Sequence, residues 1–381
     1  MAEHVALFVA DLEGGGAQRS MVDLARGFHA RGLRVDVLVV RPRGELREAL
    51  PAGVRVVALE GLLAKLPFVA GSKRRRALAS VPALLRYLRR ERPRALLATS
   101  HSTNVAASVA ARLAPGLTRV VLRIDSQLTR APELAGTRTQ RRRERRARRA
   151  FRWADAWIAI SEGVADDAAA VTGIPRERIV AIHNPVLTPA FRERATARIE
   201  HPWLAAGSAP VVIAVGRLVA QKDFATLIRA FARVRQRRKV RLLILGEGPL
   251  RGALEHLAGE QGVAADVRFT GRVANAPAWM ARAAVFALSS AWEGFGRVLV
   301  EALAVGCPVV STDCPSGPRE ILGHGAFGPL VPVGDDLALA AAIESVLDRP
   351  PDRKLLMQRA DAFSLDRGVE RYLEVLLGAP R

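Results

Sequence analysis

Cysteine, lysine and tyrosine are scarce in this sequence of 381 residues. Its two cysteines, Cys307 and Cys314, are too few for a disulfide framework and have no partners at the spacing of metal ligands. No apolar run approaches the ~18–20 residues that are needed to cross a bilayer. Residues 1–10 lack the basic start and the small-residue cleavage site of a signal peptide, and their pattern predicts a first β-strand. We therefore expect a cytoplasmic protein.

An Asp-x-Asp metal motif is also missing from the sequence. The two adjacent acidic pairs, Asp166-Asp167 and Asp335-Asp336, do not have the spacing of a metal site. We interpret both as surface residues at helix starts, where carboxylates interact favourably with the positive end of the helix. The sequence therefore predicts neither a metal nor another cofactor.

Positive charge is abundant, with 58 basic and 37 acidic residues and a formal net charge of +21 at pH 7. Only five of the basic residues are lysine. The excess of arginine accompanies abundant alanine, glycine and proline, as compositional drift in a GC-rich genome would produce. Part of the charge is thus compositional, and the remainder favours anionic partners such as phosphates, nucleic acid or an acidic membrane face.

The chain is long enough for two ordinary domains. Short β-branched runs alternate with helical patterns, which predicts parallel sheets covered by helices. This alternation starts again after a Pro- and Gly-rich stretch at residues 184–210. We predict an α/β protein with two Rossmann-like, doubly wound domains facing each other across a cleft. The strands are expected at 5–9, 35–40, 54–59, 95–99, 119–123, 157–160, 179–182, 211–215, 241–245, 267–270, 284–288 and 308–311.

The segment Arg138–Arg152 interrupts the alternation with nine arginines and one glutamate. Ala147, Ala150, Phe151 and Ala154 recur at helical spacing, so its apolar side is a narrow stripe. A solvated surface helix docked by that stripe explains the pattern. A patch that binds an anionic membrane, or one that binds nucleic acid, explains it as well.

Chemistry is expected just after the strands, because ligands bind outside the carboxyl ends of parallel strands. Gly14–Gly16 follow the first strand, and consecutive glycines let the backbone approach an anion or a sugar closely. A purely structural turn fits the same residues, since the G-x-G-x-x-G dinucleotide fingerprint is absent. His101 follows the strand at 95–99 and is either a site residue or a structural loop histidine.

The second half has more specific features. Arg217 and Lys222 follow the strand at 211–215 and precede a helix, where two cations suit a diphosphate. Glu293 and Glu301 flank a Gly-Phe-Gly turn after the strand at 284–288. That turn opens a helix whose first N–H groups are free for phosphate or sugar oxygens, and the two carboxylates can accept hydrogen bonds from sugar and ribose hydroxyls.

These residues resemble the signature of retaining GT-B glycosyltransferases of family 4. The two glutamates are separated by seven residues, and the sequences "GRLVAQKDF", "LLILGEGPL", "VRFTGRV", "RWADAWIAISEGV" and "HNPV" extend the resemblance over residues 152–322. The segment 313–320, "DCPSGPRE", resembles the bacterial branch that builds lipopolysaccharide, capsule and similar surface glycans.

The resemblance implies an acceptor-side domain at 1–186, a donor-binding domain at 187–364 and a C-terminal helix at 365–381 that crosses back to the first domain. It implies that Arg217 and Lys222 neutralise the diphosphate, that Glu293 binds the donor sugar and that Glu301 binds the ribose. The remaining donor-binding positions are Gly15, Gly16, Val273, Gly294, Phe295, Gly296 and Arg297. The expected catalytic residues are Glu293, Arg217, Lys222 and His101.

The function expected from this resemblance is transfer of a hexose or N-acetylhexosamine from a nucleoside-diphosphate sugar, with UDP as the expected nucleotide. The acceptor would be a membrane-linked glycolipid or polysaccharide, and the enzyme would sit on the inner face of the plasma membrane. A GT-B epimerase or phosphorylase, and a basic nucleic-acid-binding protein, remain as alternatives. The second lacks an interleaved aromatic stacking surface.

Overall fold

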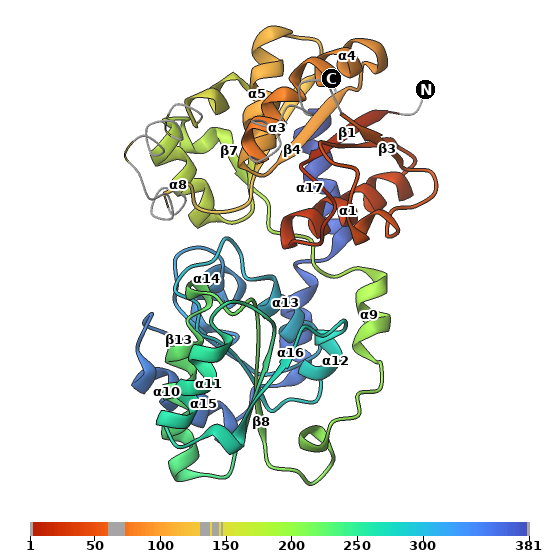
Figure 1. The fold of residues 1–381 in the computed structure, drawn as a ribbon. Helices are drawn as coiled ribbons and strands as arrows, with labels where there is room; N and C mark the ends of the chain where they lie inside the picture. The colour runs from red at the N-terminus through yellow and green to blue at the C-terminus, as the bar shows by residue number, and fades with distance from the viewer. Residues whose placement is uncertain (1–2, 60–72, 130–137, 139–144, 146–147, 379–381) are drawn as a thin grey trace. The chain divides into compact units, whose positions relative to one another are not determined.

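The computed structural model describes residues 3–59, 73–129, 138, 145 and 148–378. The chain forms two compact units: unit 1 comprises Met1–Pro185 and Leu365–Arg381, and unit 2 comprises Val186–Ser364. In Figure 1, unit 1 runs from red to yellow-green and includes the blue helix α17 (Leu365–Leu377). Most of the arginine-rich segment Arg138–Arg152 lies outside the described residues.

Unit 1 contains a parallel sheet of seven strands among the described residues, in the order β3-β2-β1-β4-β5-β6-β7. Its central strands are predominantly apolar and buried on both faces, as expected for a sheet that is covered on both sides. The strands are β1 (His4–Val9), β2 (Arg34–Val39), β3 (Arg55–Ala58), β4 (Ala95–Thr99), β5 (Arg119–Ile124), β6 (Ala156–Ala159) and β7 (Ile179–Ala181).

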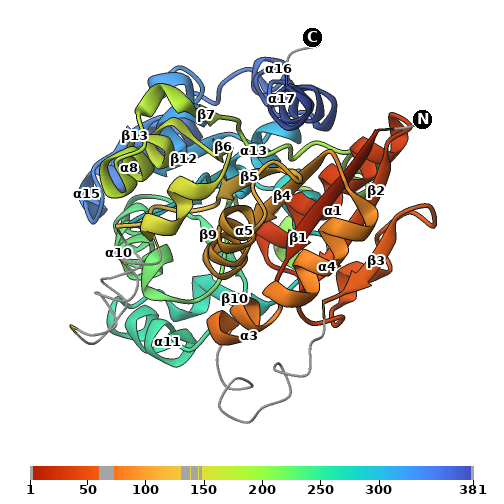
Figure 2. The ribbon, with the colours of Figure 1, turned by 90° about the horizontal axis from the view of Figure 1, so that it is seen from above.

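Helices α1 and α17 pack together on one face of this sheet, in a core that includes Leu7, Leu97 and Tyr372. Helices α3, α4 and α5 form a second group, which Figure 2 shows from above, and α5 contacts β4 and β5. The α-helices in the described part of unit 1 are α1 (Gly16–Ala30), α3 (Lys73–Ala79), α4 (Val81–Glu91), α5 (His101–Leu113), α8 (Glu162–Thr172) and α17.

Unit 2 contains a second parallel sheet, of six strands among the described residues, in the order β10-β9-β8-β11-β12-β13. The strands are β8 (Val211–Val215), β9 (Arg241–Leu245), β10 (Val267–Gly271), β11 (Val285–Leu288), β12 (Val309–Thr312) and β13 (Leu330–Val331). The prediction of two doubly wound α/β units is confirmed by these two all-parallel sheets.

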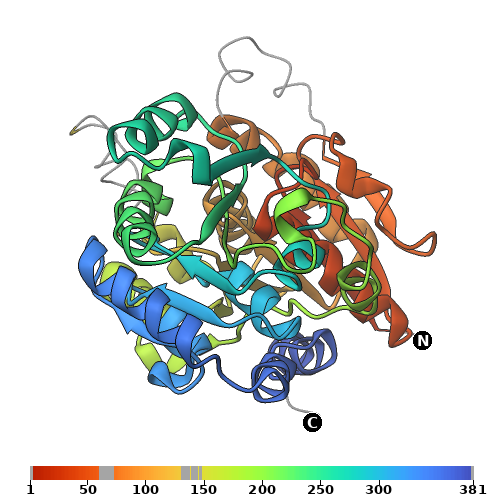
Figure 3. The ribbon, with the colours of Figure 1, turned by 90° about the horizontal axis from the view of Figure 1, so that it is seen from below.

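Helices α10 and α15 pack side by side and, with α11, cover a core that includes Phe231, Leu242 and Ile343 (Figure 3). Helices α12, α13 and α16 form a separate group in which α13 contacts β11 and β12. The helices of unit 2 are α9 (Pro189–Ala195), α10 (Phe224–Arg237), α11 (Arg251–Glu260), α12 (Ala276–Met280), α13 (Arg297–Ala304), α14 (Pro318–Ile321), α15 (Asp336–Asp348) and α16 (Arg353–Asp361).

One predicted helix start is wrong. Asp335 caps α15 by accepting the N–H of Ala338 at 2.9 Å, as expected for the second acidic pair. Asp166 and Asp167 instead lie inside α8, where Asp166 pairs with Arg176 and Asp167 binds the loop at 128–129. The actual cap of α8 is Ser161, whose hydroxyl accepts the N–H of Val164.

Each sheet reverses its winding at one place. In unit 1 the strand order reverses between β1 and β4, and in unit 2 it reverses between β8 and β11. Loops after two such strands turn to opposite sides and leave a crevice at the carboxyl edge, where ligands of doubly wound sheets bind. The glycines 14–16 and His101 follow β1 and β4, while Arg217 and Glu293 follow β8 and β11.

No described helix is long and apolar enough to span a bilayer.

Candidate active site

The centre of the unit 2 site is an ion pair between Lys222 and Glu293, which lie 71 residues apart in the sequence. The Lys222 ammonium group donates to Glu293 Oε1, and the hydroxyl of Ser290 donates to the same oxygen at 2.7 Å. The Glu293 residue is only 7% exposed. A carboxylate this buried needs such partners, since an unpaired charge would be strongly destabilising.

The loop after β8 holds Lys222 through its backbone. The Lys222 carbonyl accepts a hydrogen bond from the Ser289 hydroxyl at 2.8 Å, and Gln221 bonds to the backbone of Ala291 and Trp292. Asp223 follows in the left-handed conformation with φ 41° and caps α10 by accepting the N–H of Thr226. The loops after β8 and β11 are therefore tied to each other, which fixes the ammonium group beside the carboxylate.

Glycines allow the loop after β9 to approach the loop after β8. A Cβ atom on Gly246 would lie 1.8 Å from the carbonyl oxygen of Gly216, and one on Gly248 would lie 2.4 Å from that of Leu218. The two glycines of the segment "GEGPL" are therefore required by these backbone contacts. Arg217, between these contacts, is exposed, and Val273 lies just beyond β10.

The turn after Glu293 rests on the loop that follows β12. A Cβ atom on Gly317 (φ 89°) would lie 2.0 Å from the Phe295 carbonyl oxygen, so only glycine fits there. The Phe295 ring is buried and packs edge-on against Phe363 at 5.6 Å between ring centroids. Gly296, at φ 92°, then turns the chain into α13.

Helix α13 places the other predicted residues near its first turns. Gly294 precedes the helix, Arg297 is its first residue and Glu301 lies about one turn inside, half-buried. The amide groups at the start of the helix give this end a partial positive charge. The predicted residues thus comprise the paired Lys222 and Glu293, the exposed Arg217, the half-buried Glu301 and a helix N-terminus. Such a set suits an anion that carries hydroxyl groups.

The two cysteines take no part in this chemistry as nucleophiles. Burial raises the pKa of the Cys314 thiol to about 12, and burial raises that of Cys307 to about 12 as well. Both thiols are therefore protonated at neutral pH. The part of the chain that the structure describes contains no group of three or more His, Cys, Asp or Glu residues that could hold a metal ion.

Comparison with known protein families gives two matches on this chain. Residues 209–349 match the family described as glycosyl transferases group 1, and residues 14–188 match the family described as glycosyltransferase family 4. The second match covers the glycines of unit 1, and the first covers the site of unit 2. The chain belongs to glycosyltransferase family 4, group 1. The predicted family is therefore confirmed.

Curated relatives resemble part of the chain. It is 37% identical over 171 residues to the N-acetylgalactosamine-N,N'-diacetylbacillosaminyl-diphospho-undecaprenol 4-alpha-N-acetylgalactosaminyltransferase of Campylobacter jejuni, over 44% of this chain and 46% of that protein. It is 37% identical over 177 residues to the lipopolysaccharide core biosynthesis glycosyltransferase LpsE of Rhizobium meliloti, over 45% of this chain and 51% of the relative. The chain thus spans about half the length of the curated relatives it matches.

Solved structures share the whole fold. The crystal structure of Anabaena Alr3699/HepE in complex with UDP and glucose superposes with a TM-score of 0.76 and covers 98% of this chain and 99% of its own. At 22% identity this similarity concerns the fold alone. It agrees with the two parallel sheets described above and confirms the predicted GT-B fold class.

In unit 1 of this family 4 protein, the predicted site residues follow β1 and β4. Gly14 takes φ 101°, and Gly15 precedes α1, which begins at Gly16. Beside this turn, the buried Asp11 accepts hydrogen bonds from Gln18 at 3.2 Å and from Arg41 at 2.8 Å. An ion pair between the buried Asp11 and the partly exposed Arg41 thus lies beside the glycine turn.

His101 is the first residue of α5, directly after the carboxyl end of β4. Its ring lies 5.8 Å from that of Phe151, and its Nε2 atom is buried without a hydrogen-bond partner among the described residues. Burial, with the nearby Arg148 and Arg74 guanidinium groups, lowers the pKa of His101 to about 4. The imidazole is therefore neutral at pH 7.

Several residues that shape these sites were not predicted from the sequence. Ser289 and Ser290 hold Lys222 and Glu293, and Gly317 supports Phe295. Two consecutive serines at the end of a buried strand were the available signal for the first two. Asp125 accepts the N–H of Ser100 just before α5. It lies one residue beyond β5, so the tendency of functional residues to follow parallel strands could also have pointed to it.

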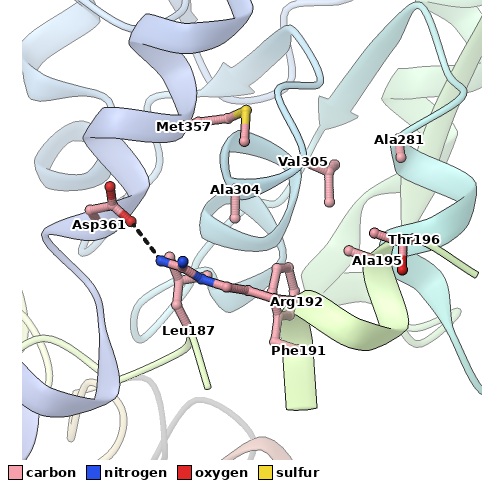
Figure 4. A pocket seen from close by; sticks show the side chains of 10 residues that line it. All are labelled: Leu187, Phe191, Arg192, Ala195, Thr196, Ala281, Ala304, Val305, Met357 and Asp361. Carbon is pink, nitrogen blue, oxygen red and sulfur yellow. Dashed lines mark hydrogen bonds and ion pairs between the residues drawn. The ribbon is translucent and has the colours of Figure 1, made fainter. Parts of the chain in front are cut away.

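A pocket of about 460 Å³ lies elsewhere in unit 2 (Figure 4). It contains none of the predicted site residues. Ala304 and Val305 from the C-terminal end of α13 line it, whereas Glu293 lies before the other end of that helix. Arg192 and Asp361 pair across its rim at 3.3 Å. The other lining residues are Leu187, Phe191, Ala195, Thr196, Ala281 and Met357.

Proposed function

We propose that this family 4 protein transfers a hexose or N-acetylhexosamine from a UDP-sugar to a lipid-linked glycan, with retention of the anomeric configuration. The observation that carries the proposal is the pairing of Lys222 with the buried Glu293, whose carboxylate Ser290 also holds, at the reversal point of the unit 2 sheet. Cations and a carboxylate side by side match a ligand that joins a diphosphate to a polyhydroxylated ring.

The donor would bind with its diphosphate between Arg217, Lys222 and the start of α13. Both contacts that fix Glu293 are made to Oε1, so Oε2 would accept hydroxyl groups of the sugar. Glu301, about one turn inside α13, would bind the ribose, and Val273 would lie near the base. A UDP complex of a structural neighbour supports UDP as the nucleotide.

Bond cleavage would build negative charge on the departing UDP. Fixed cations and helix N–H groups stabilise such charge without reorganising during the reaction. The departing phosphate would then accept the proton of the incoming acceptor hydroxyl on the same face of the sugar. His101 of unit 1 would serve the acceptor side, with the neutral imidazole orienting a hydroxyl group. Gly15 and Gly16 of the glycine turn would contact the donor.

The acceptor is inferred from the relatives. One acts on a diphospho-undecaprenol-linked glycan and the other in lipopolysaccharide core biosynthesis, so both names point to lipid-anchored sugars. An enzyme with such an acceptor would work at the membrane surface. The described residues of the arginine-rich segment include exposed Arg138, Arg145, Arg149 and Arg152, and each could contribute about 1 kcal/mol of attraction to anionic lipid.

Two measurements test the proposal. Thermal-shift screening with UDP-, GDP- and dTDP-sugars should show stabilisation by a UDP-sugar, worth about 2.7 kcal/mol at 100 times its Kd. Incubation of that donor with an undecaprenyl-diphosphate-linked glycan should extend the lipid-linked product, and proton NMR should show the donor's anomeric configuration. Strong, salt-sensitive binding of nucleic acid without any nucleotide-sugar binding would overturn the proposal, and so would epimerised or phosphorolysed donor in place of transfer.

Sedimentation with vesicles tests the membrane contact separately. The protein should sediment with anionic vesicles, less with neutral ones, and less again in high salt. Equal sedimentation in all three conditions would contradict the membrane contact.

A further inference from the structure

The backbone of Ser100 is unusual. This residue joins β4 to α5 with φ 76° and ψ 151°, a region that is essentially restricted to glycine. It immediately precedes His101. Such a conformation persists only when the surroundings determine it, and it is common where a functional group must be aimed.

The carboxylate of Asp125 holds this backbone. Its Oδ2 atom accepts the N–H of Ser100 at 3.0 Å and the hydroxyl hydrogen of Thr99. The hydroxyl of Ser100 is 2.9 Å from that of Thr103 in the first turn of α5. Asp125 therefore fixes the residues just before and at the turn into the helix.

A buried guanidinium group fixes Asp125 in turn. Arg123 is fully buried, forms an ion pair with Asp125 and donates to the Thr99 hydroxyl at 3.0 Å. It also donates to the Tyr372 hydroxyl at 2.8 Å and to the side-chain oxygen of Asn184. Because these hydrogen bonds fix the orientation of the guanidinium group, the ion pair leaves the carboxylate of Asp125 little freedom to rotate.

The imidazole of His101 depends on this arrangement. Within the described part of the chain its Nε2 atom has no hydrogen-bond partner, and its ring packs near Phe151. A side chain that is not held by such a hydrogen bond takes its position from its backbone and its packing. The strained Ser100 sets that backbone, and Asp125 sets Ser100.

We propose that Asp125 is a positioning residue that keeps Ser100 in its strained conformation and thereby aims the imidazole of His101. The inference rests on the proposed function, in which His101 serves the acceptor side of the transfer. Arg123 and Thr99 support the carboxylate, and Asp125 itself does not touch the substrates.

The first test is a double-mutant cycle on transfer kinetics. Asp125→Ala should lower kcat by roughly 10- to 100-fold, as expected for a small misplacement of a functional group, and leave the Kd for UDP unchanged by calorimetry. Glycine tolerates the conformation of residue 100 without strain. In a Ser100→Gly background the same Asp125→Ala change should therefore lower kcat by less than about fivefold. An equal loss in both backgrounds would overturn the proposal, and so would wild-type kcat in a folded Asp125→Ala protein.

Asp155→Ala is the matched control. That carboxylate also holds a backbone N–H of the same sheet, accepting from Val120 at 2.7 Å near the amino end of β5. It should affect stability and leave kcat unaltered. If Asp125→Ala does not fold, because Arg123 loses its ion-pair partner, Asp125→Asn retains an acceptor oxygen. That variant should fold and give a smaller loss of kcat in the same direction, and wild-type kcat would count against the proposal.

The second test does not require activity. Protein with histidine labelled at Cε1 should give one imidazole carbon–proton signal for each of its seven histidines, and His101→Ala identifies that of His101. Asp125→Ala should shift or broaden this signal alone, and Ser100→Gly with Asp125→Ala should return it toward its original position. An unmoved signal would overturn the positioning role. Should the wild-type protein transfer no sugar, the proposed function fails, and the NMR result decides the positioning role by itself.

Discussion

The two sheet-reversal edges of the molecule are built alike and charged differently. In each, a glycine-containing turn follows one central strand, and a helix begins soon after the other. The unit 2 edge carries an ion pair between Lys222 and Glu293 with an exposed Arg217 nearby. At the unit 1 edge the imidazole of His101 is neutral, and Asp125 holds the backbone of Ser100 just before it.

This difference suggests a division of labour. A diphosphate is a strong anion whose binding benefits from fixed positive charge. A sugar hydroxyl needs a neutral group that can exchange hydrogen bonds, and a charged group there would have to be desolvated first. Doubly wound sheets offer both edges the same scaffold, so the side chains at the strand ends determine which partner each edge can serve.

Changing His101 should give the largest separation between the edges. We expect His101→Ala to lower the transfer rate by ~10²–10⁴-fold, the range for a residue in acid–base or hydroxyl-orienting catalysis, with an unchanged Kd for UDP. His256→Ala, an exposed histidine on α11, is the control. Wild-type transfer by His101→Ala would assign that histidine a structural role and remove the division of labour.

Removing either cation should instead weaken nucleotide binding, and the effect should be smaller than that of His101→Ala on the transfer rate. Each charge-assisted contact is worth roughly 1.5–3 kcal/mol, so Lys222→Ala and Arg217→Ala should each weaken UDP binding by about 10- to 150-fold, with turnover falling in parallel. Calorimetric titration measures the affinity, and exposed Lys239→Ala serves as control. If a folded Arg217→Ala or Lys222→Ala protein binds UDP as wild type does, the diphosphate is held elsewhere.

Glu301 should affect the nucleotide alone. Loss of a carboxylate that accepts ribose hydroxyls should weaken UDP binding about tenfold, while transfer at saturating donor stays close to the wild-type rate. Steady-state kinetics over a range of donor concentrations separates these effects. A lowered rate at saturation with unchanged UDP affinity would place Glu301 in the reaction instead.

The neutral state of His101 should also be visible as a pH dependence of stability. Its pKa is lowered to about 4 in the folded protein, whereas the unfolded chain takes up the proton near pH 6.5. Stability from this group is therefore complete above pH 6.5 and declines as the pH falls toward 4, by on the order of 2–3 kcal/mol. Denaturant unfolding of wild type and His101→Gln across this range should show the shallower decline in the variant. Parallel curves would mean that the imidazole is not held in its uncharged form.

The sequence predicts the strands well because buried parallel strands are short β-branched runs. β4, β8 and β9 begin and end where expected, while β13 was missed since two residues leave no periodic pattern. The positions of Arg217 and Glu293 could be predicted because both follow such strands. The pairing of Glu293 with Lys222 could not, because the two residues lie in different loops that only the sheet order brings together.

Longer contacts escape local patterns altogether. Arg123 and Tyr372 are separated by 249 residues and meet inside one unit. Arginine in the middle of an apolar strand gives a signal that something must pair with it, since buried charge requires partners. Nothing in the spacing indicates which residue that is. The predicted helix start at Asp166 was wrong for a local reason: acidic residues favour the first turn of a helix only as a tendency.

The contacts of Arg123 have a further consequence for dissection of the chain. Unit 2 is an uninterrupted stretch, inserted between the two segments of unit 1. A protease that cut near residues 185 and 364 would release unit 2 as a single peptide. It would leave unit 1 as two peptides held by noncovalent contacts, among them the Tyr372 hydroxyl on the buried guanidinium group and Val369 against Gly27. Co-purification of the short C-terminal peptide with the first fragment would then measure how strongly α17 binds to the rest of unit 1.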